Sequence, residues 1–221
     1  MRKFLVWVAA TILVGSPAFA QAISDPVGDY LPTFTGTEDP ALDIISASAV
    51  FDGNNFTFSS TSAGAVGVTG SLYIFGINRG AGTARLASGS PSIGASVLWD
   101  AVAVLFPDGT GRVVTFPTAG PPTITTLPGV VTVNDDAISG VFSASLLGST
   151  GFSPGDYTFT EWSRLRLNPA ADGTNAEIAD FAASGATVTT VPEAPTWAMM
   201  IMGFGVAGRL LRRRRKVFVR V

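Results

Sequence analysis

The stretch VLWDAVAVLFPDGTGRVVTF, residues 97–116, contains the strongest fold signal in the chain. Residues 97–106 are apolar on both faces apart from Asp100, a pattern typical of a strand in the middle of a sheet. Pro107-Asp108-Gly109 then supplies residue types that reverse a chain, and residues 112–116 return as a second strand. The stretch therefore predicts a β-hairpin.

The same pattern continues on both sides of this hairpin. Further strands are predicted at residues 45–51, 56–58, 72–77, 130–133, 138–142, 157–167, 180–182 and 186–190. Turn residues separate them, and helix is expected only as one turn at residues 145–147. The spacing predicts an all-β fold, a β-sandwich or jelly-roll-like domain. A β-solenoid is the alternative, but it needs a fixed internal period, which the sequence lacks.

The charge of the chain is unevenly distributed. Residues 21–190 contain five arginines and fifteen carboxylates, so this domain carries a net charge of −10, whereas the whole chain carries only −2. The difference comes mainly from basic residues near the C-terminus. An acidic domain repels phosphate backbones, so nucleic-acid binding is not expected.

The residue types that are missing exclude several chemistries. The chain has no Cys and no His, and its lysines are Lys3 and Lys216. Zinc sites built from Cys and His, Ser-His-Asp and Cys-His nucleophiles, and lysine Schiff bases within the domain are therefore excluded. Without disulfides, the domain must depend on its core alone. We expect a non-enzymatic protein.

The N-terminus has the three parts of a secretory signal peptide. Arg2 and Lys3 precede an apolar stretch at residues 4–14, and Ala18-Phe19-Ala20 gives the small-x-small pattern around a signal peptidase site. Residues 1–20 are thus predicted to direct the chain to the export machinery and to be removed by signal peptidase. An uncleaved anchor helix is the alternative reading.

The C-terminus carries a tripartite tail at residues 191–216. The motif at 191–197 precedes an apolar segment at 196–211, which is predicted to be a transmembrane helix. A basic cluster at 212–216 should keep the tail tip in the cytoplasm, so the domain is held outside the inner membrane. The motif residues are Pro192, Glu193, Ala194, Pro195 and Trp197, and the basic cluster is Arg212, Arg213, Arg214, Arg215 and Lys216.

This tail resembles the PEP-CTERM sorting signal of Gram-negative bacteria, in the subgroup whose motif continues into Trp-Ala-Met. It departs from the usual Pro-Glu-Pro-Ala in having Pro-Glu-Ala-Pro at residues 192–195. The same tail is sometimes labelled an ice-binding protein C-terminal domain. The resemblance implies that exosortase cuts near Pro192 to Pro195, and that the setting is the cell surface or a biofilm matrix with exopolysaccharide as a partner. A permanent membrane anchor is the alternative.

Acidic residues crowd the segment before the first predicted strand. Asp25, Asp29, Asp39 and Asp43 are the candidate ligands of a calcium ion, because calcium takes six to eight oxygen ligands and an exported domain meets it at high concentration. A solvated acidic loop is the alternative. Asp135-Asp136 is predicted to be a hairpin turn. No other cofactor is expected.

The sequence offers two further candidate sites, one for a carbohydrate ligand and one for catalysis. Trp99, Trp162, Tyr73 and Tyr157 could form an exposed aromatic platform of a carbohydrate-binding module, with core packing as the alternative. Asp100 and Glu161 could act as the carboxylate pair of a glycoside hydrolase. Strand parity points Glu161 inward, where it would need a partner such as Arg79, Arg85 or Arg112. The preferred function is a structural or adhesive surface or extracellular-matrix protein.

Overall fold

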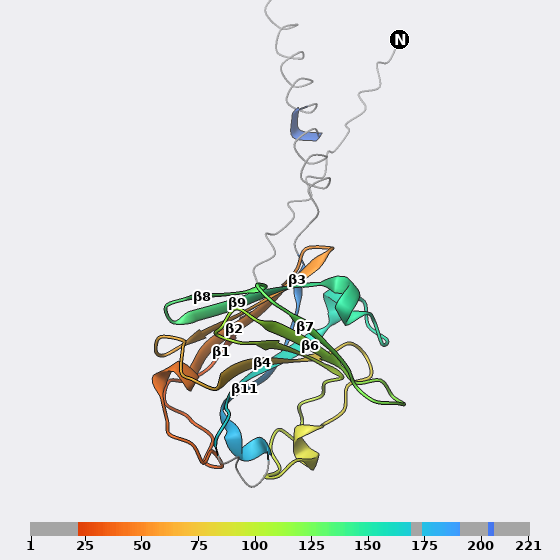
Figure 1. Cartoon of the computed structure of the whole chain (residues 1–221). Coiled ribbons are helices and arrows are strands. Elements are labelled where there is room, and N and C mark those ends of the chain that lie inside the picture. Colours follow the sequence, from red (N-terminus) through yellow and green to blue (C-terminus); the bar gives the residue numbers. More distant parts are fainter. Residues whose placement is uncertain (1–21, 169–173, 191–202, 206–221) are drawn as a thin grey trace, which may run out of the picture.

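The computed structural model describes residues 22–168, 174–190 and 203–205 (Figure 1). The predicted signal peptide with Ala18 and Ala20 lies outside these residues, as do the sorting motif and the basic cluster. Of the predicted transmembrane segment only residues 203–205 are described, and they are helical. Within the described part of the chain, no helix has both the length and the apolar character needed to cross a membrane.

The described domain consists of two packed sheets (Figure 1). Sheet A contains, in spatial order, β1 (Ala22–Ser24), β2 (Ile44–Phe51), β3 (Asn55–Ser62), β9 (Ala137–Ser143) and β8 (Val131–Asn134), with β12 (Thr189–Thr190) pairing with β2. Sheet B contains β11 (Ile178–Thr187), β10 (Thr158–Leu165), β4 (Ser71–Asn78), β5 (Ala101–Leu105), β6 (Gly111–Thr115) and β7 (Thr123–Leu127). All neighbours are antiparallel except β12 and β2. The predicted all-β architecture of two packed sheets is confirmed.

Short 3-10 helices occupy the connections. They are η1 (Pro40–Leu42), η2 (Leu86–Ser88), η3 (Ala144–Leu147), η4 (Pro154–Asp156) and η5 (Thr174–Glu177). The helical turn predicted at residues 145–147 corresponds to η3. In Figure 1 the yellow segment with η2 and the blue segment with η5 lie on the side of sheet B that faces away from sheet A.

The hairpin at the centre of the sequence forms as predicted, between β5 and β6. Asp108 accepts a hydrogen bond from the Thr110 amide at 2.8 Å, and Gly109 adopts a positive φ of 90°. Every residue of β5 is buried, as expected for a central strand. The strand begins later than predicted, because the backbone of Trp99 pairs with that of Thr83 in an isolated bridge outside the sheet.

The structure also departs from the predicted strands at three places. The strands β1 and β7 were not predicted, and both are short. In β2 a register shift between Ile44 and Ser46 buries Ile44 and leaves Ile45 half-buried, whereas simple alternation predicts Ile45 as the core residue. A bulge of this kind adds one residue to a strand and reverses the facing of the residues beyond it.

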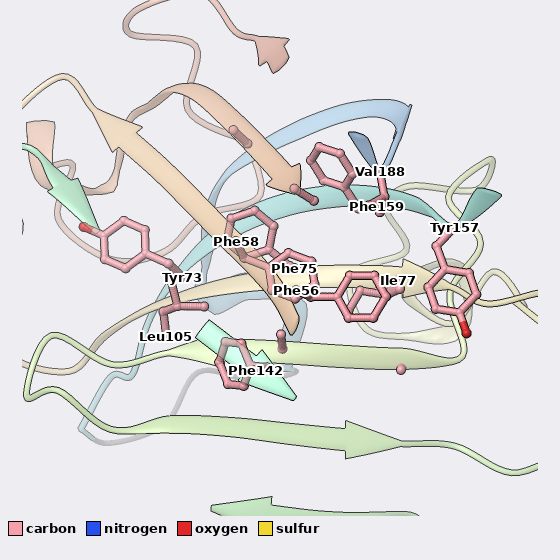
Figure 2. Close-up of a cluster of buried hydrophobic side chains, with 14 of the residues drawn as sticks. Phe56, Phe58, Tyr73, Phe75, Ile77, Leu105, Phe142, Tyr157, Phe159 and Val188 are labelled. Atoms are coloured by element: carbon pink, nitrogen blue, oxygen red, sulfur yellow. The ribbon is translucent and has the colours of Figure 1, made fainter. Parts of the chain in front are cut away.

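Aromatic side chains fill the space between the sheets (Figure 2). Phe56 stacks on Tyr157 with ring centroids 5.6 Å apart, and Phe58 lies 5.1 Å from Phe75 and 6.0 Å from Phe142. Phe58 therefore contacts rings from sheet B and from its own sheet. Since the chain has no cysteine, burial of this layer is the main source of stability.

Replacing Phe58 by Ala should remove the ring that connects the two sheets. A core Phe→Ala change costs about 3–5 kcal/mol, because it loses buried area and leaves a cavity. Urea denaturation would measure the loss. The matched control is Phe152→Ala, since Phe152 is 40% exposed and should change stability by less than about 1 kcal/mol. Equal effects of the two changes would contradict the assigned core.

Candidate metal centre

Carboxylates gather where β1, β2 and β11 meet. Asp25 follows β1, Asp29 lies in the turn after it, Asp43 precedes β2, and Asp180 lies on β11. Asp25, Asp29 and Asp180 each offer an oxygen, and these three oxygens lie within 4.8 Å of one another. Asp43 lies beside them, since its charge acts on Asp25, and its Oδ2 accepts a hydrogen bond from the Gly28 amide at 2.8 Å. We call these four residues the acidic cluster.

Backbone amides hold two of the four carboxylates in place. Asp180 accepts hydrogen bonds from the Ile44 amide at 2.7 Å and from the Phe181 amide at 2.6 Å. The first of these bonds joins β11 of sheet B to β2 of sheet A. By contrast, Oδ2 of Asp25 and Oδ1 of Asp43 are buried and have no hydrogen-bond partner. Buried oxygens without a partner are costly, so these two atoms indicate a missing cation or proton.

The surroundings disfavour the ionised forms of these carboxyl groups. Burial, followed by the charges of Asp29 and Asp43, raises the pKa of Asp25 to about 6. Burial also raises the pKa of Asp180 to about 7, although its two backbone hydrogen bonds act in the opposite direction. The pKa of Asp43 is raised chiefly by burial. Among the described residues, no arginine offsets these shifts, so the cluster lacks a positive partner within the domain.

Calcium fits the donors of the acidic cluster. Calcium binds carboxylate oxygens at about 2.3–2.6 Å, so oxygens around one ion are at most about 5 Å apart. The spacing of the Asp25, Asp29 and Asp180 oxygens lies within that limit. Asp29 is exposed, which leaves room for water ligands on the outer side. An ion there would give the carboxylate of Asp25 a partner and would offset the charge of the nearby Asp43.

The predicted calcium candidates are thus only partly brought together. Asp25, Asp29 and Asp43 lie in the cluster, whereas Asp39 does not: its Oδ1 accepts a hydrogen bond from the Ala41 amide at 2.9 Å and caps η1. Asp180 was not predicted, because it lies 136 residues from its partner Ile44. The available signal was a single carboxylate within the apolar run IADFAA at residues 178–183.

Glu161 on β10 is fully buried beside this region. It faces the interior like Phe159, as strand parity predicted, and neither carboxylate oxygen has a hydrogen-bond partner. Burial raises its pKa well above the usual value, and the charges of Asp180 and Asp25 add to this, while the nearby Ser60 partly offsets it. The prediction that an arginine pairs with Glu161 is wrong. Arg79 binds Asp100, while Arg85 and Arg112 lie over aromatic rings.

The other candidate residues are buried in the fold or form a turn. Trp99 and Trp162 are only 7% and 4% exposed, so the prediction of an exposed aromatic platform is wrong. Tyr73 and Tyr157 are buried, and their hydroxyls donate to the carbonyls of Ala41 and Leu147. Asp100 is buried and bound to Arg79. The predicted hairpin turn at 135–136 is confirmed, with Asp135 at a φ of 55°.

Comparison with known protein families identifies the tail. Residues 190–216 match the PEP-CTERM protein-sorting motif. This motif implies export, sorting to the cell surface and processing by exosortase. The domain that precedes it is β-sandwich-like. No curated protein matches the chain.

The pKa shifts predict that the metal-free protein loses stability as pH rises. Asp25, Asp180 and Glu161 all bind protons more tightly in the folded than in the unfolded state. The stability that these groups contribute is fully present below the unfolded-state pKa of about 4. It is lost as the pH rises through the folded-state pKa values of Asp25 and Asp180, about 6 and 7. Thermal unfolding in chelator between pH 4 and pH 8 would measure this decline.

The change Glu161→Gln removes one of these ionisations without changing the shape of the side chain. At pH 8 its melting temperature should exceed that of the wild type by roughly 2–4 °C for each kcal/mol of ionisation cost removed. Near pH 4 the two melting temperatures should be equal. The control Glu38→Gln makes the same chemical change at an exposed position. A decline with pH as steep in Glu161→Gln as in the wild type would show that Glu161 does not contribute.

Proposed function

We propose that the chain is a non-catalytic structural or adhesive protein of the cell surface or extracellular matrix. The signal peptide at residues 1–20 exports it, residues 196–211 hold it in the inner membrane, and exosortase then cuts near Pro192 to Pro195. The tail is of the Trp-Ala-Met subgroup, on the evidence of residues 197–199. The match at residues 190–216 is the observation that carries this proposal.

A non-catalytic domain is supported by the state of its candidate catalytic groups. A glycosidase needs two carboxyl groups facing the same sugar across an open cleft. Asp100 is 1% exposed and bound to Arg79, while Glu161 is 0% exposed between the sheets. The chain also lacks His and Cys, which supply many general bases and nucleophiles.

Calcium binding to the acidic cluster gives this domain a means of stabilisation outside the cell. The ion would join the segment after β1 to β11 and remove the repulsion among four carboxylates. Extracellular modules bind calcium in the range of about 0.1–1 mM. A free concentration ten times the Kd would stabilise the fold by about 1.4 kcal/mol.

Intact-mass analysis of the protein from its native envelope tests the sorting. The mature chain should begin at Gln21 and end near residues 192–195, and in a strain without exosortase it should retain its C-terminus. The double change Pro192→Ala/Pro195→Ala should reduce processing, because prolines hold the segment extended for the protease. The control Pro121→Ala/Pro122→Ala changes two exposed prolines of the domain. A chain ending at Val221 in both strains would contradict the proposal.

Calcium titration of the thermal unfolding temperature at pH 7.5 tests the metal site. Calcium should raise the midpoint by about 2–4 °C per kcal/mol gained, and Asp29→Asn should reduce that gain. Asp29 is exposed, so this change should leave the metal-free fold intact. Asp156→Asn removes the same charge at an exposed position outside the cluster. An equal calcium response in both variants would exclude the acidic cluster as the site.

A further inference from the structure

The outer face of sheet B carries an open groove of about 460 Å³. Strand alternation supplies its apolar floor, because residues of β4 and β5 that do not face sheet A point here, including Ile74, Val102 and Val104. The segment with η2 and the short helix η5 form one wall, joined where Asn175 donates to the carbonyls of Leu86 and Pro91 at 2.8 Å. The groove is thus built by several elements of the fold.

Four of the five arginines of the domain line this groove, namely Arg85, Arg112, Arg164 and Arg166. None of the described lining residues is acidic. Among the described residues, Glu177 binds one groove arginine, Arg164, with its Oε2 3.0 Å from the Nε. In a domain of net charge −10, this concentrates nearly all positive charge on one face.

The groove also contains N–H donors that lack acceptors. The Nε atoms of Arg85 and Arg112 and the Nε1 of Trp99 are buried without a hydrogen-bond partner. The two guanidinium groups are held in position by aromatic rings: Arg85 lies 4.4 Å from the ring centre of Phe116, and Arg112 lies 5.0 Å from that of Phe106. Buried donors are normally paired, so these three indicate a ligand rich in oxygen acceptors.

We propose that this groove binds an acidic saccharide, with arginine forks gripping sugar carboxylates and the apolar floor supporting the ring faces. Arginine binds carboxylates in a bidentate manner that suits this role. The groove lies on the face of the sheet and not along a free strand edge, so strand addition by a peptide is disfavoured.

This inference rests on the proposed adhesive role and names its ligand, but it does not depend on calcium binding. The two sites use different residues on different parts of the domain. If the protein binds no saccharide but still responds to calcium, only the proposal of a saccharide-binding groove is contradicted. Loss of the calcium response with intact saccharide binding would contradict only the metal site.

Isothermal titration of the full chain in mild detergent tests the groove. The probes are short galacturonate oligomers, the same oligomers as methyl esters, neutral glucose oligomers and single-stranded DNA, each with and without calcium. The galacturonate oligomers should bind, and more weakly at higher salt. The esters, the neutral oligomers and the DNA should each bind at least about tenfold more weakly, because they lack the spaced carboxylates that arginines recognise.

The double change Arg112→Gln/Arg166→Gln should weaken galacturonate binding by about tenfold or more. The control Thr132→Glu adds a negative charge on β8 of the opposite sheet. It should change the galacturonate affinity by less than about twofold. Should the double variant unfold, Arg166→Gln alone serves, because Arg166 is exposed. No galacturonate binding, equal binding of the esters or of DNA, or full affinity in the folded arginine variant would each overturn the proposal.

Discussion

One layer of aromatic side chains, buried between sheets A and B, holds the two sheets of the domain together. The chain has no cysteine, so no disulfide can hold the sheets together. Each sheet must therefore turn large rings inward, and Phe58, Phe75 and Phe142 meet there (Figure 2). Polar and charged groups are excluded from most of this layer. Charged groups lie near β1, β2 and β11, in the buried Arg79–Asp100 pair and on the outer face of sheet B.

The end of the layer near β1, β2 and β11 carries an electrostatic cost. Asp25, Asp43, Asp180 and the buried Glu161 lie in or beside this region, and burial raises the pKa of each of them. The Asp180 to Ile44 hydrogen bond ties the two sheets there, so the region cannot easily open to solvent. A divalent ion bound by Asp25, Asp29 and Asp180 would neutralise this charge and would link the segment after β1 to β11.

Local patterns in the sequence predicted much of the fold but little of the site. Period-two alternation and turn residues predicted the β5–β6 hairpin and the turn at Asp135, because both depend on neighbours in the chain. The strand β7 was missed, since its TITTL sequence is exposed or half-buried and carries a weak apolar signal. Asp180 and the four groove arginines are assembled by pairings between distant strands, which no local pattern encodes.

We expect calcium to close the exported sandwich at its acidic end. A crystal structure of the protein grown with calcium, with anomalous data to identify the ion, tests this most directly. We expect a calcium peak with oxygens of Asp25, Asp29 and Asp180 at about 2.3–2.6 Å. A structure at neutral pH with millimolar calcium that shows these carboxylates without an ion would contradict it.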